Sequence, residues 1–208
     1  RDVIADLATP DLASQFALLR MPPRPAQGGP ARAVVILITS NRGLAGGFNS
    51  NLIKEARRRI AALTAEGYQV ELVGVGKKGV GFFKYIRQAI RSERPDIGDR
   101  PTAEHAASVV DELVTDFAEG RIGVVELVQS KFISVLNSPP TTVRVLPIQM
   151  PSARRGMRPD YILSPDPATL LESLLPLYVR NTMYRGLVET VAAEQAARRT
   201  AMKNATDN

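Results

Sequence analysis

The sequence of 208 residues contains no cysteine, no tryptophan and a single histidine. The lack of cysteine excludes disulfides, thiolate chemistry and metal sites built on cysteine. Aromatic residues make up only 5% of the chain and are not interleaved with the basic residues, so base stacking on nucleic acid is not indicated. No apolar run approaches the roughly 20 residues that a membrane-spanning helix needs, so we expect no direct membrane span.

Motifs that carry catalysis are also missing. There is no His-Glu-x-x-His, no Gly-x-Ser-x-Gly and no calcium-binding loop. The histidine, His105, lies beside Glu104 at the start of a predicted helix, where we expect it to be solvated. Asp111, Glu112 and Asp116 follow on the rim of the same helix, where we expect them to serve solubility. We therefore predict no catalytic residue, no cofactor and no metal, and the sequence favours an interaction protein over a self-sufficient enzyme.

The charge is unbalanced, with a formal net charge of +6. This charge permits acidic partners and leaves a nucleic-acid binder as one alternative, which would require a steep dependence of affinity on salt. The densest basic cluster comprises Lys54, Arg57, Arg58 and Arg59 on one predicted helix. Such a run is typical of a solvated helix face.

Residues 31–150 alternate between buried strands and amphipathic helices, which predicts an α/β domain with a doubly wound, mostly parallel sheet. Strands are expected at 33–39, 70–75, 89–90 and 123–128, and the last could extend to Leu136. Helices are expected at 51–66, at 80–85 and from Thr102 to Gly120. Alternating residues at 142–146 predict one antiparallel edge strand.

The C-terminal part, residues 165–208, reads as one long helix. Asp166 is a good N-cap, and Pro167 suits the first helical position. The helix would be roughly 60 Å long, whereas the remaining globule would be only about 40 Å across, so it should protrude and meet a partner. Pro176 should kink its first turns. Residues 1–20 are expected to be the tail of another helix that enters from upstream.

An apolar stripe at spacings of three and four follows this helix and predicts a seam of coiled-coil or docking type. Its members are Leu170, Leu174, Leu177, Tyr184, Val188 and Val191. The stripe becomes polar at Gln195 and Arg198.

Two glycine clusters raise the question of a nucleotide. Residues 41–49 match neither a P-loop nor G-x-G-x-x-G. Residues 74–79, Gly-Val-Gly-Lys-Lys-Gly, do match the dinucleotide pattern between a strand and a helix, with Asp96 about twenty residues further on. A small dinucleotide-dependent Rossmann enzyme is therefore the second alternative. Because the cluster follows the second strand rather than the first, we favour glycines that serve a tight turn.

Two longer motifs carry a resemblance to a known family. Residues 38–51, Ile-Thr-Ser-Asn-Arg-Gly-Leu-Ala-Gly-Gly-Phe-Asn-Ser-Asn, resemble the first strand, turn and helix of the F-type ATP synthase gamma subunit. Residues 193–208 resemble the C-terminal signature of the same family. Gly76-Lys77-Lys78-Gly79 with Phe82-Phe83, and Lys131-Phe132-Ile133, fit between them. In the family, Asp is common at the position of Asn41 and Cys at that of Ala45, and neither difference should alter the turn.

The resemblance implies the central rotor stalk of a proton-translocating machine. Its two terminal helices would form a coiled coil inside a hexamer of alpha and beta subunits. Its α/β domain would be a collar near the epsilon subunit and the membrane c-ring. The subunit would bind no nucleotide, and the complex would lie on the cytoplasmic face of the bacterial plasma membrane, or on the matrix or stromal side in an organelle. Compared with the family, we expect the chain to lack most of the N-terminal helix and the C-terminal tip.

The resemblance also implies roles for individual residues. The partner interface would comprise Glu194, Gln195, Arg198, Met202 and Thr206. A second set would shape the turn of the collar and its contact with the shaft, and comprises Arg42, Gly43, Gly46, Gly47 and Asn49.

Overall fold

A computed structural model describes residues 14–20, 31–149 and 166–207. A short 3-10 helix, η1, spans Ala17–Leu19. The remaining elements are, in chain order, β1 (Ala31–Ile38), α3 (Phe48–Ala65), β2 (Tyr68–Val75), α4 (Lys77–Tyr85), β3 (Ile90–Arg94), α5 (Ala103–Ala118), β4 (Val124–Ser130), β5 (Pro140–Leu146) and α6 (Pro167–Asp207).

The five strands form one sheet in the order β3-β2-β1-β4-β5. The first three pairings are parallel, whereas β5 runs antiparallel to β4 at the edge. The chain leaves β1 toward β2 on one side and later returns to β4 on the other, so the topological switch point lies between the carboxyl ends of β1 and β4. The predicted fold class, with its antiparallel edge strand, is confirmed.

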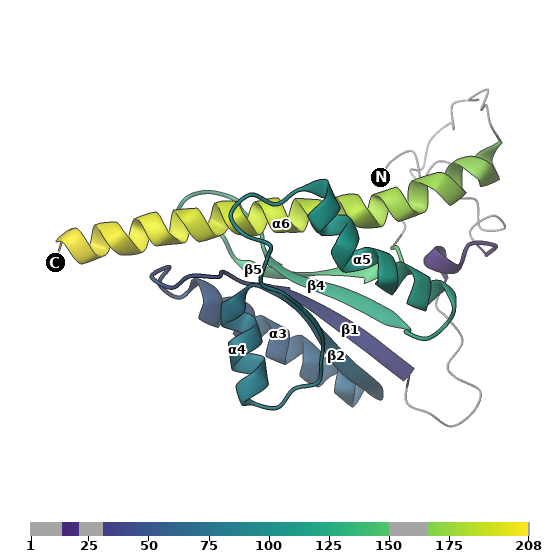
Figure 1. The fold of residues 1–208 in the computed structure, drawn as a ribbon, viewed down its shortest axis with the longest axis horizontal. Helices are drawn as coiled ribbons and strands as arrows, with labels where there is room; N and C mark the ends of the chain where they lie inside the picture. Colours follow the sequence, from purple (N-terminus) through teal and green to yellow (C-terminus); the bar gives the residue numbers. More distant parts are fainter. Residues whose placement is uncertain (1–13, 21–30, 150–165, 208) are drawn as a thin grey trace.

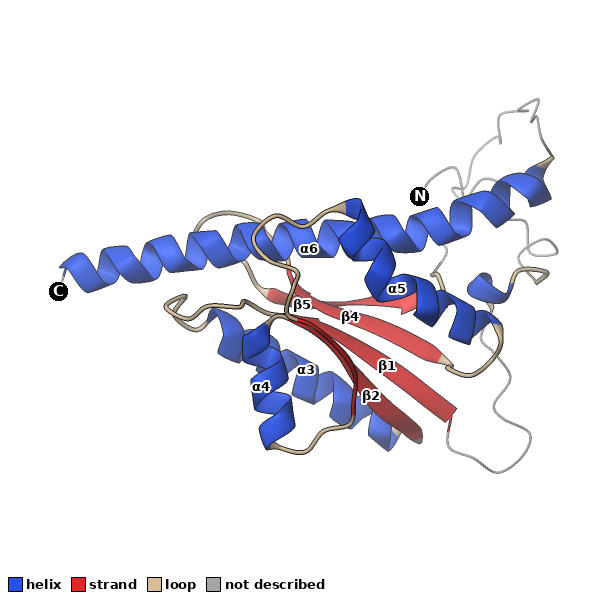
Figure 2. Ribbon diagram, viewed as in Figure 1, coloured by secondary structure: helices blue, strands red, loops and turns tan. Residues whose placement is uncertain are grey.

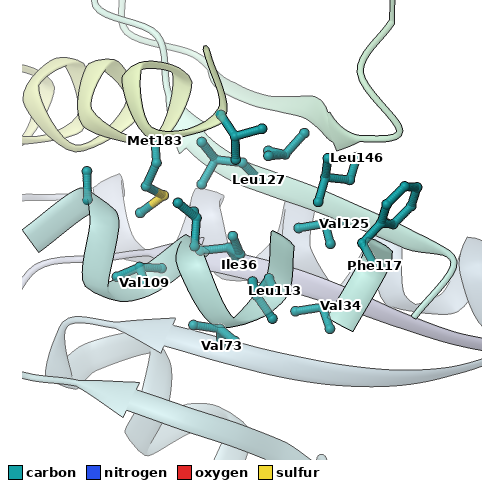
Figure 3. Close-up of a cluster of buried hydrophobic side chains, with 14 of the residues drawn as sticks. Val34, Ile36, Val73, Val109, Leu113, Phe117, Val125, Leu127, Leu146 and Met183 are labelled. Atoms are coloured by element: carbon teal, nitrogen blue, oxygen red, sulfur yellow. The ribbon is translucent and has the colours of Figure 1, made fainter. Parts of the chain in front are cut away.

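Helices cover both faces of the sheet, as Figures 1 and 2 show. Alternate residues of β1 serve the two faces: Val34 and Ile36 pack with α5 and α6, whereas Val35 and Leu37 pack with α3 and α4. In the first cluster Met183 of α6 and Leu113 of α5 pack together with Ile36 of β1 and the other strand residues labelled in Figure 3. Full burial of each such side chain contributes about 1.5–3 kcal/mol, so the two clusters hold the layers together.

Helix α6 runs unbroken for 41 residues and continues past the sheet (Figure 1). Asp166 caps it, because its Oδ1 accepts the backbone N–H groups of Ala168 and Thr169 at 3.0 and 3.2 Å. Pro176 lies inside this continuous helix and does not interrupt it. Residues 202–207 are all exposed, so the predicted protrusion is confirmed.

The predicted apolar seam of α6 is not the face that packs on its own sheet, and its role in docking a partner stays a prediction. The face that packs on the sheet carries residues four apart along the helix: Leu171, Leu175, Val179, Met183 and Leu187. Three members of the predicted stripe are exposed instead: Leu177, Tyr184 and Val188. The helix therefore has two apolar faces, and the face that packs on the sheet is not the one that carries the predicted stripe.

Two further boundaries differ from the expectations. Strand β4 ends at Ser130, and the chain to Leu136 is a loop in which Ile133 and Leu136 are exposed, so the extension of this strand is wrong. Of the expected helix at residues 1–20, the structure describes residues 14–20, which contain a 3-10 helix with a buried Leu18. The rest of that expected helix lies outside the described residues.

Candidate functional site at the junction of α6 and the sheet

The C-terminal half of α6 crosses the carboxyl end of the sheet at the switch point. Thr190 of α6 accepts a hydrogen bond on its Oγ1 from the backbone N–H of Ser130, the last residue of β4, at 3.1 Å. Between the helix and the ends of β1 and β2 only a cavity of ≈ 10 Å³ remains, lined by Ile38, Thr39 and Leu187 among others. Doubly wound sheets bind their ligands in this crevice. Here the helix closes the crevice over β1 and β2 to the size of at most one water molecule. Further along α6 an open pocket of ≈ 350 Å³ remains beside the turn that follows β1, lined by Gly46, Leu136 and Ala201 among others.

The turn between β1 and α3 packs against the same helix beyond the edge of the sheet. Ala45 and Ala193 of α6 belong to one buried cluster. Gly46 has a φ of +55°, and a Cβ placed there would lie 3.9 Å from Cβ of Ala201. Leu44 also has a positive φ, of 62°, and its side chain is exposed. The turn is therefore a tight bend whose inner side faces α6.

The five residues predicted to shape this turn have distinct positions. Asn49 holds its start, because its Oδ1 accepts the backbone N–H of Ser40 at 3.0 Å. Gly47 is the N-cap of α3, and Gly46 faces α6. Arg42 forms an exposed ion pair with Asp99. Gly43 lies on the outer side, where Cε of Lys78 would be 3.9 Å from a Cβ.

Asn41 connects this turn to two other segments. Its Nδ2 donates to the carbonyl oxygens of Pro95 and Ile97, at 3.1 and 3.2 Å, and its Oδ1 accepts the backbone N–H of Lys77 at 3.0 Å. An aspartate, which is acceptor-only when ionised, could not donate to the two carbonyl groups. Asparagine at this position therefore uses its amide nitrogen as a donor and its amide oxygen as an acceptor.

The glycine cluster at 74–79 serves packing rather than a free anion site. The backbone N–H groups of Lys77, Lys78 and Gly79 at the start of α4 donate to Asn41 Oδ1, the Ser40 carbonyl and Thr39 Oγ1, at 3.0, 3.1 and 2.9 Å. A pyrophosphate would need these same donors.

The glycines themselves are required by close contacts. A Cβ on Gly76 would lie 2.0 Å from the carbonyl oxygen of Thr39, and one on Gly74 would lie 2.4 Å from Cγ2 of Val80. These contacts favour the tight-turn interpretation over the dinucleotide alternative.

The predicted partner-interface residues divide into two groups. Glu194, Gln195 and Arg198 come together, since the guanidinium of Arg198 binds the carboxylate of Glu194 and donates to Gln195 Oε1 at 3.1 Å. The side chain of Glu194 is only 6% exposed, so its charge is satisfied within the chain. Met202 and Thr206 lie apart on the protruding end, and the hydroxyl of Thr206 donates to the Met202 carbonyl at 3.0 Å.

Several charged residues have structural roles that the sequence did not indicate. Asp116 is buried and binds Arg91 and Arg121, so the prediction that it serves solubility is wrong. Burial opposes its ionised form, but hydrogen bonds from Arg121 and Arg91 outweigh it and leave the pKa of Asp116 below the ordinary value. Asp111 receives two hydrogen bonds of 2.8 Å from Arg180, which joins α5 to α6.

Two of the sites that were expected to be solvated also make contacts within the chain, while Lys54, Arg57 and Arg58 are exposed as expected. His105 forms a capping box with Thr102: its backbone N–H donates to Thr102 Oγ1, and its Nδ1 accepts the backbone N–H of Thr102. In the basic cluster of α3, Arg59 reaches the buried Glu126, and Arg57 lies over the ring of Phe82 at 5.9 Å from its centroid.

The contact between α6 and β4 also depends on a residue that sequence reasoning missed. A Cβ on Gly186 would lie 2.3 Å from Oε1 of Gln129 and 2.8 Å from Cδ2 of Leu127. An isolated glycine inside a helical pattern was the available signal, because such a glycine often marks a close approach.

Within residues 14–20, 31–149 and 166–207, no group of three acidic, histidine or cysteine side chains is placed to hold a metal ion. No helix in these same ranges combines the length and apolar character needed to cross a bilayer.

Solved structures define the class of this fold. The chain is similar to a subunit in the central stalk and c-ring structure of the Tetrahymena thermophila mitochondrial ATP synthase, with a TM-score of 0.64 and 20% identity over 94% of this chain and 85% of that one. A chain of the Euglena gracilis mitochondrial ATP synthase rotor gives a TM-score of 0.64 and 17% identity over 97% and 78%. The fold is thus that of central-stalk subunits.

Sequence comparisons give the family. A family model described as ATP synthase matches residues 1–208. The ATP synthase gamma chain of Gemmatimonas aurantiaca is 51% identical over 209 residues, covering all of this chain and 70% of the relative. That of Leptospira biflexa is 36% identical over 85% of this chain and 62% of the relative, so the chain spans about two thirds of such relatives. The chain belongs to the ATP synthase gamma chain family, as the two motifs predicted, and no comparison supports the dinucleotide alternative.

Proposed function

We propose that this chain is the central rotor subunit of a proton-translocating F-type ATP synthase. It couples rotation of the membrane ring to conformational change in the catalytic beta subunits, and it carries no catalytic residue of its own. The observation that carries the proposal is the protrusion of α6 in a member of the gamma chain family. Residues 202–207 extend past the sheet with every side chain exposed, among them Met202, which is 50% exposed.

The protrusion supports the proposal because a helix that leaves its own domain gains little from burial and needs an external partner. The partners that we propose are the alpha and beta subunits around the protruding end of α6, and the epsilon subunit and the c-ring near the collar. The assembly would be peripheral to the bilayer, on the cytoplasmic face of the bacterial plasma membrane or the equivalent side in an organelle.

Within this interface we propose two roles. Gln195, Met202 and Thr206, which are exposed on α6, would contact the partner subunits directly. Glu194 and Arg198 bind each other across one helical turn, so they would stiffen the face from which those contacts are made.

Co-purification from membranes tests this function. An affinity tag on the full-length subunit should retain alpha, beta and epsilon subunits from a detergent-solubilised membrane fraction. A matched variant with proline at Ala201, inside the protruding helix, should retain fewer of the hexamer subunits, because proline breaks the helix there. Recovery of a monodisperse tagged subunit without any of these partners would contradict the proposal.

Charge reversal at Arg198 gives a functional test in the assembled enzyme. Arg198→Glu removes the bond to Glu194 and places two like charges one turn apart. We expect ATP-driven proton pumping to fall relative to ATP hydrolysis. Pumping that equals that of the unaltered enzyme would reject the proposed role of this pair.

A further inference from the structure

We infer that Gly186 and Thr190 of α6 interlock with Gln129 and Ser130 of β4 and fix the rotational setting of the shaft helix on the collar. We call these four residues the α6 clamp. The inference rests on the proposed function, because it names the place where torque passes between the α/β domain and the shaft. It is argued from two contacts of different kinds.

The first contact is steric, because a side chain of β4 occupies the space that the missing side chain of Gly186 leaves on α6. Gly186 is buried, and the side chain of Gln129 occupies the space that a Cβ would need, with Oε1 at 2.3 Å from its position. Gln129 is itself buried and sits opposite Thr141 in the β4–β5 register. The side chain of Gln129 thus acts as a peg in a gap on the helix surface, although it also lines a pocket of ≈ 480 Å³ into which its end can move. The buried Leu127, whose Cδ2 would lie 2.8 Å from a Cβ on Gly186, closes the gap from the strand side.

The second contact is directional. Thr190 follows Gly186 by four residues and thus lies on the same helix face one turn later. Its buried Oγ1 accepts the backbone N–H of Ser130 at 3.1 Å. Ser130 is held in turn, since its own Oγ donates to the Ser138 carbonyl at 2.9 Å. A hydrogen bond weakens steeply when its angle changes, so this bond resists rotation of α6 about its axis.

The other contacts of α6 with this face of the sheet are of a different character. Leu171, Leu175 and Val179 are apolar and bury area without a preferred direction. Such contacts hold the helix down but oppose small rotations only weakly. The clamp adds direction, and beyond it the buried cluster that joins Ala45 to Ala193 holds the helix against the turn that follows β1. The stretch held in this way, from 186 to 193, is about 10 Å long at ~1.5 Å per residue.

Amide hydrogen exchange of Ser130 in the full-length subunit tests the directional contact. Thr190→Val keeps the shape of the side chain but removes the acceptor, so exchange at Ser130 should accelerate at least tenfold. Thr190→Ser keeps the hydroxyl and should restore slow exchange. Equal protection in the unaltered subunit and in Thr190→Val would overturn the clamp.

Coupling in the assembled enzyme tests the transfer of torque. Gly186→Ala should lower the number of protons pumped per ATP hydrolysed at least twofold in inverted membrane vesicles. The control is Gly81→Ala in α4, because a Cβ there meets nothing within 4 Å. Alanine is the better helix former at both sites, so only the clash at Gly186 separates the two variants. Adding Gln129→Ala to Gly186→Ala removes the peg but leaves Cδ2 of Leu127 2.8 Å from the new Cβ, so coupling should be restored in part, and no gain at all would count against the clamp.

The results of these experiments distinguish failure of the clamp from failure of the proposed function. Normalising pumping to ATP hydrolysis removes a loss that is due only to poor assembly. If Gly186→Ala does not assemble, Thr190→Val decides: it must lower the ratio, whereas Thr190→Ser must not. Unaltered subunit that never couples hydrolysis to pumping would overturn the proposed function and the clamp together. Normal coupling in Gly186→Ala and in Thr190→Val would overturn the clamp alone.

Discussion

Arg59 of α3 donates two hydrogen bonds of 2.8 Å to the carboxylate of Glu126 in β4. Arg144 of β5 adds bonds of 2.9 and 3.1 Å to the same carboxylate. The side chain of Glu126 is 4% exposed, so the carboxylate is buried between two guanidinium groups. These bonds join a helix on one face of the sheet to its antiparallel edge, and they satisfy a charge that would otherwise be costly to bury.

Replacing Arg59 should therefore destabilise the domain. Arg59→Met leaves Glu126 with Arg144 as its partner and should lower the free energy of unfolding by about 2 kcal/mol, measured by urea denaturation. Arg58→Met is the matched control one residue earlier, because the side chain of Arg58 is 68% exposed, so solvent screens its pair with Glu55 more than that of Arg59, which is 20% exposed. Equal denaturation midpoints for the two variants would contradict the structural role of Arg59.

The case of Glu126 also indicates what could be read from the sequence. A glutamate inside the apolar run Val124-Val125-Glu126-Leu127-Val128 is a signal for a buried charge that needs a partner. The identity of the partner was not accessible, because Arg59 lies 67 residues away and meets Glu126 only when α3 packs on the sheet. The strand pattern itself was predictable, since buried parallel strands have continuous apolar runs.

The apolar stripe predicted on α6 shows a second limit of what can be inferred from helical periodicity in the sequence. The doublets Leu170-Leu171 and Leu174-Leu175 supply two rows at the same spacing, about 100° apart around the helix. Periodicity alone cannot choose between the rows, and packing of the second row on the sheet decides it. The long motifs identified the turn at 42–49 and the end of α6, but not Gly186, whose contact with Gln129 depends on how closely the helix approaches the strand.

Asp116 should make the stability of the domain depend on acid pH. Its pKa in the folded state lies below the ordinary value of 3.8, so the unfolded chain binds the proton first as the pH falls. The stabilisation is therefore complete at neutral pH and is lost as the pH drops through 3.8 and then through the folded-state pKa. Asp116→Asn should lower the free energy of unfolding by about 1–2 kcal/mol at neutral pH, and the difference from the unaltered protein should shrink in acid.

Urea denaturation over a series of pH values measures this effect. The matched control is Glu172→Gln, because Glu172 is an exposed carboxylate on α6. It should leave the midpoint unchanged at neutral pH. A destabilisation by Asp116→Asn that stays constant down to strongly acid pH would show that the bonds to Arg91 and Arg121 are not its source.

Gly76 and Gly67 separate backbone strain from a steric clash. Both have a φ of +89°, but a Cβ on Gly76 would lie 2.0 Å from the Thr39 carbonyl oxygen, whereas one on Gly67 would meet nothing within 4 Å. Gly67→Ala should therefore cost about 1–2 kcal/mol, from the left-handed backbone alone. Gly76→Ala should cost at least about 3 kcal/mol, because β1 must move away from the start of α4.

Thermal or urea unfolding of the two variants measures the difference. Gly76 also has a ψ of 147°, a backbone region that is essentially restricted to glycine, so the excess in Gly76→Ala reports the contact with Thr39 together with this added strain. Similar losses in the two variants would mean that the ends of β1 and β2 tolerate a wider separation than the structure has.

Glu194 and Met202 should affect different properties of the subunit. Glu194 is buried and holds Arg198, so Glu194→Ala should lower the free energy of unfolding of the isolated full-length subunit by about 1 kcal/mol. Met202 is half exposed on the protruding end of α6, so Met202→Ala should leave that stability unchanged.

In the assembled enzyme Met202→Ala should weaken the binding of partner subunits more than Glu194→Ala does, because burial of Met202 against a partner would be lost. The measurement is the fraction of tagged subunit that retains alpha and beta subunits through a salt wash. Equal retention in Met202→Ala and the unaltered subunit would remove Met202 from the proposed interface, and a stability loss in Met202→Ala would mean that its side chain packs within its own chain.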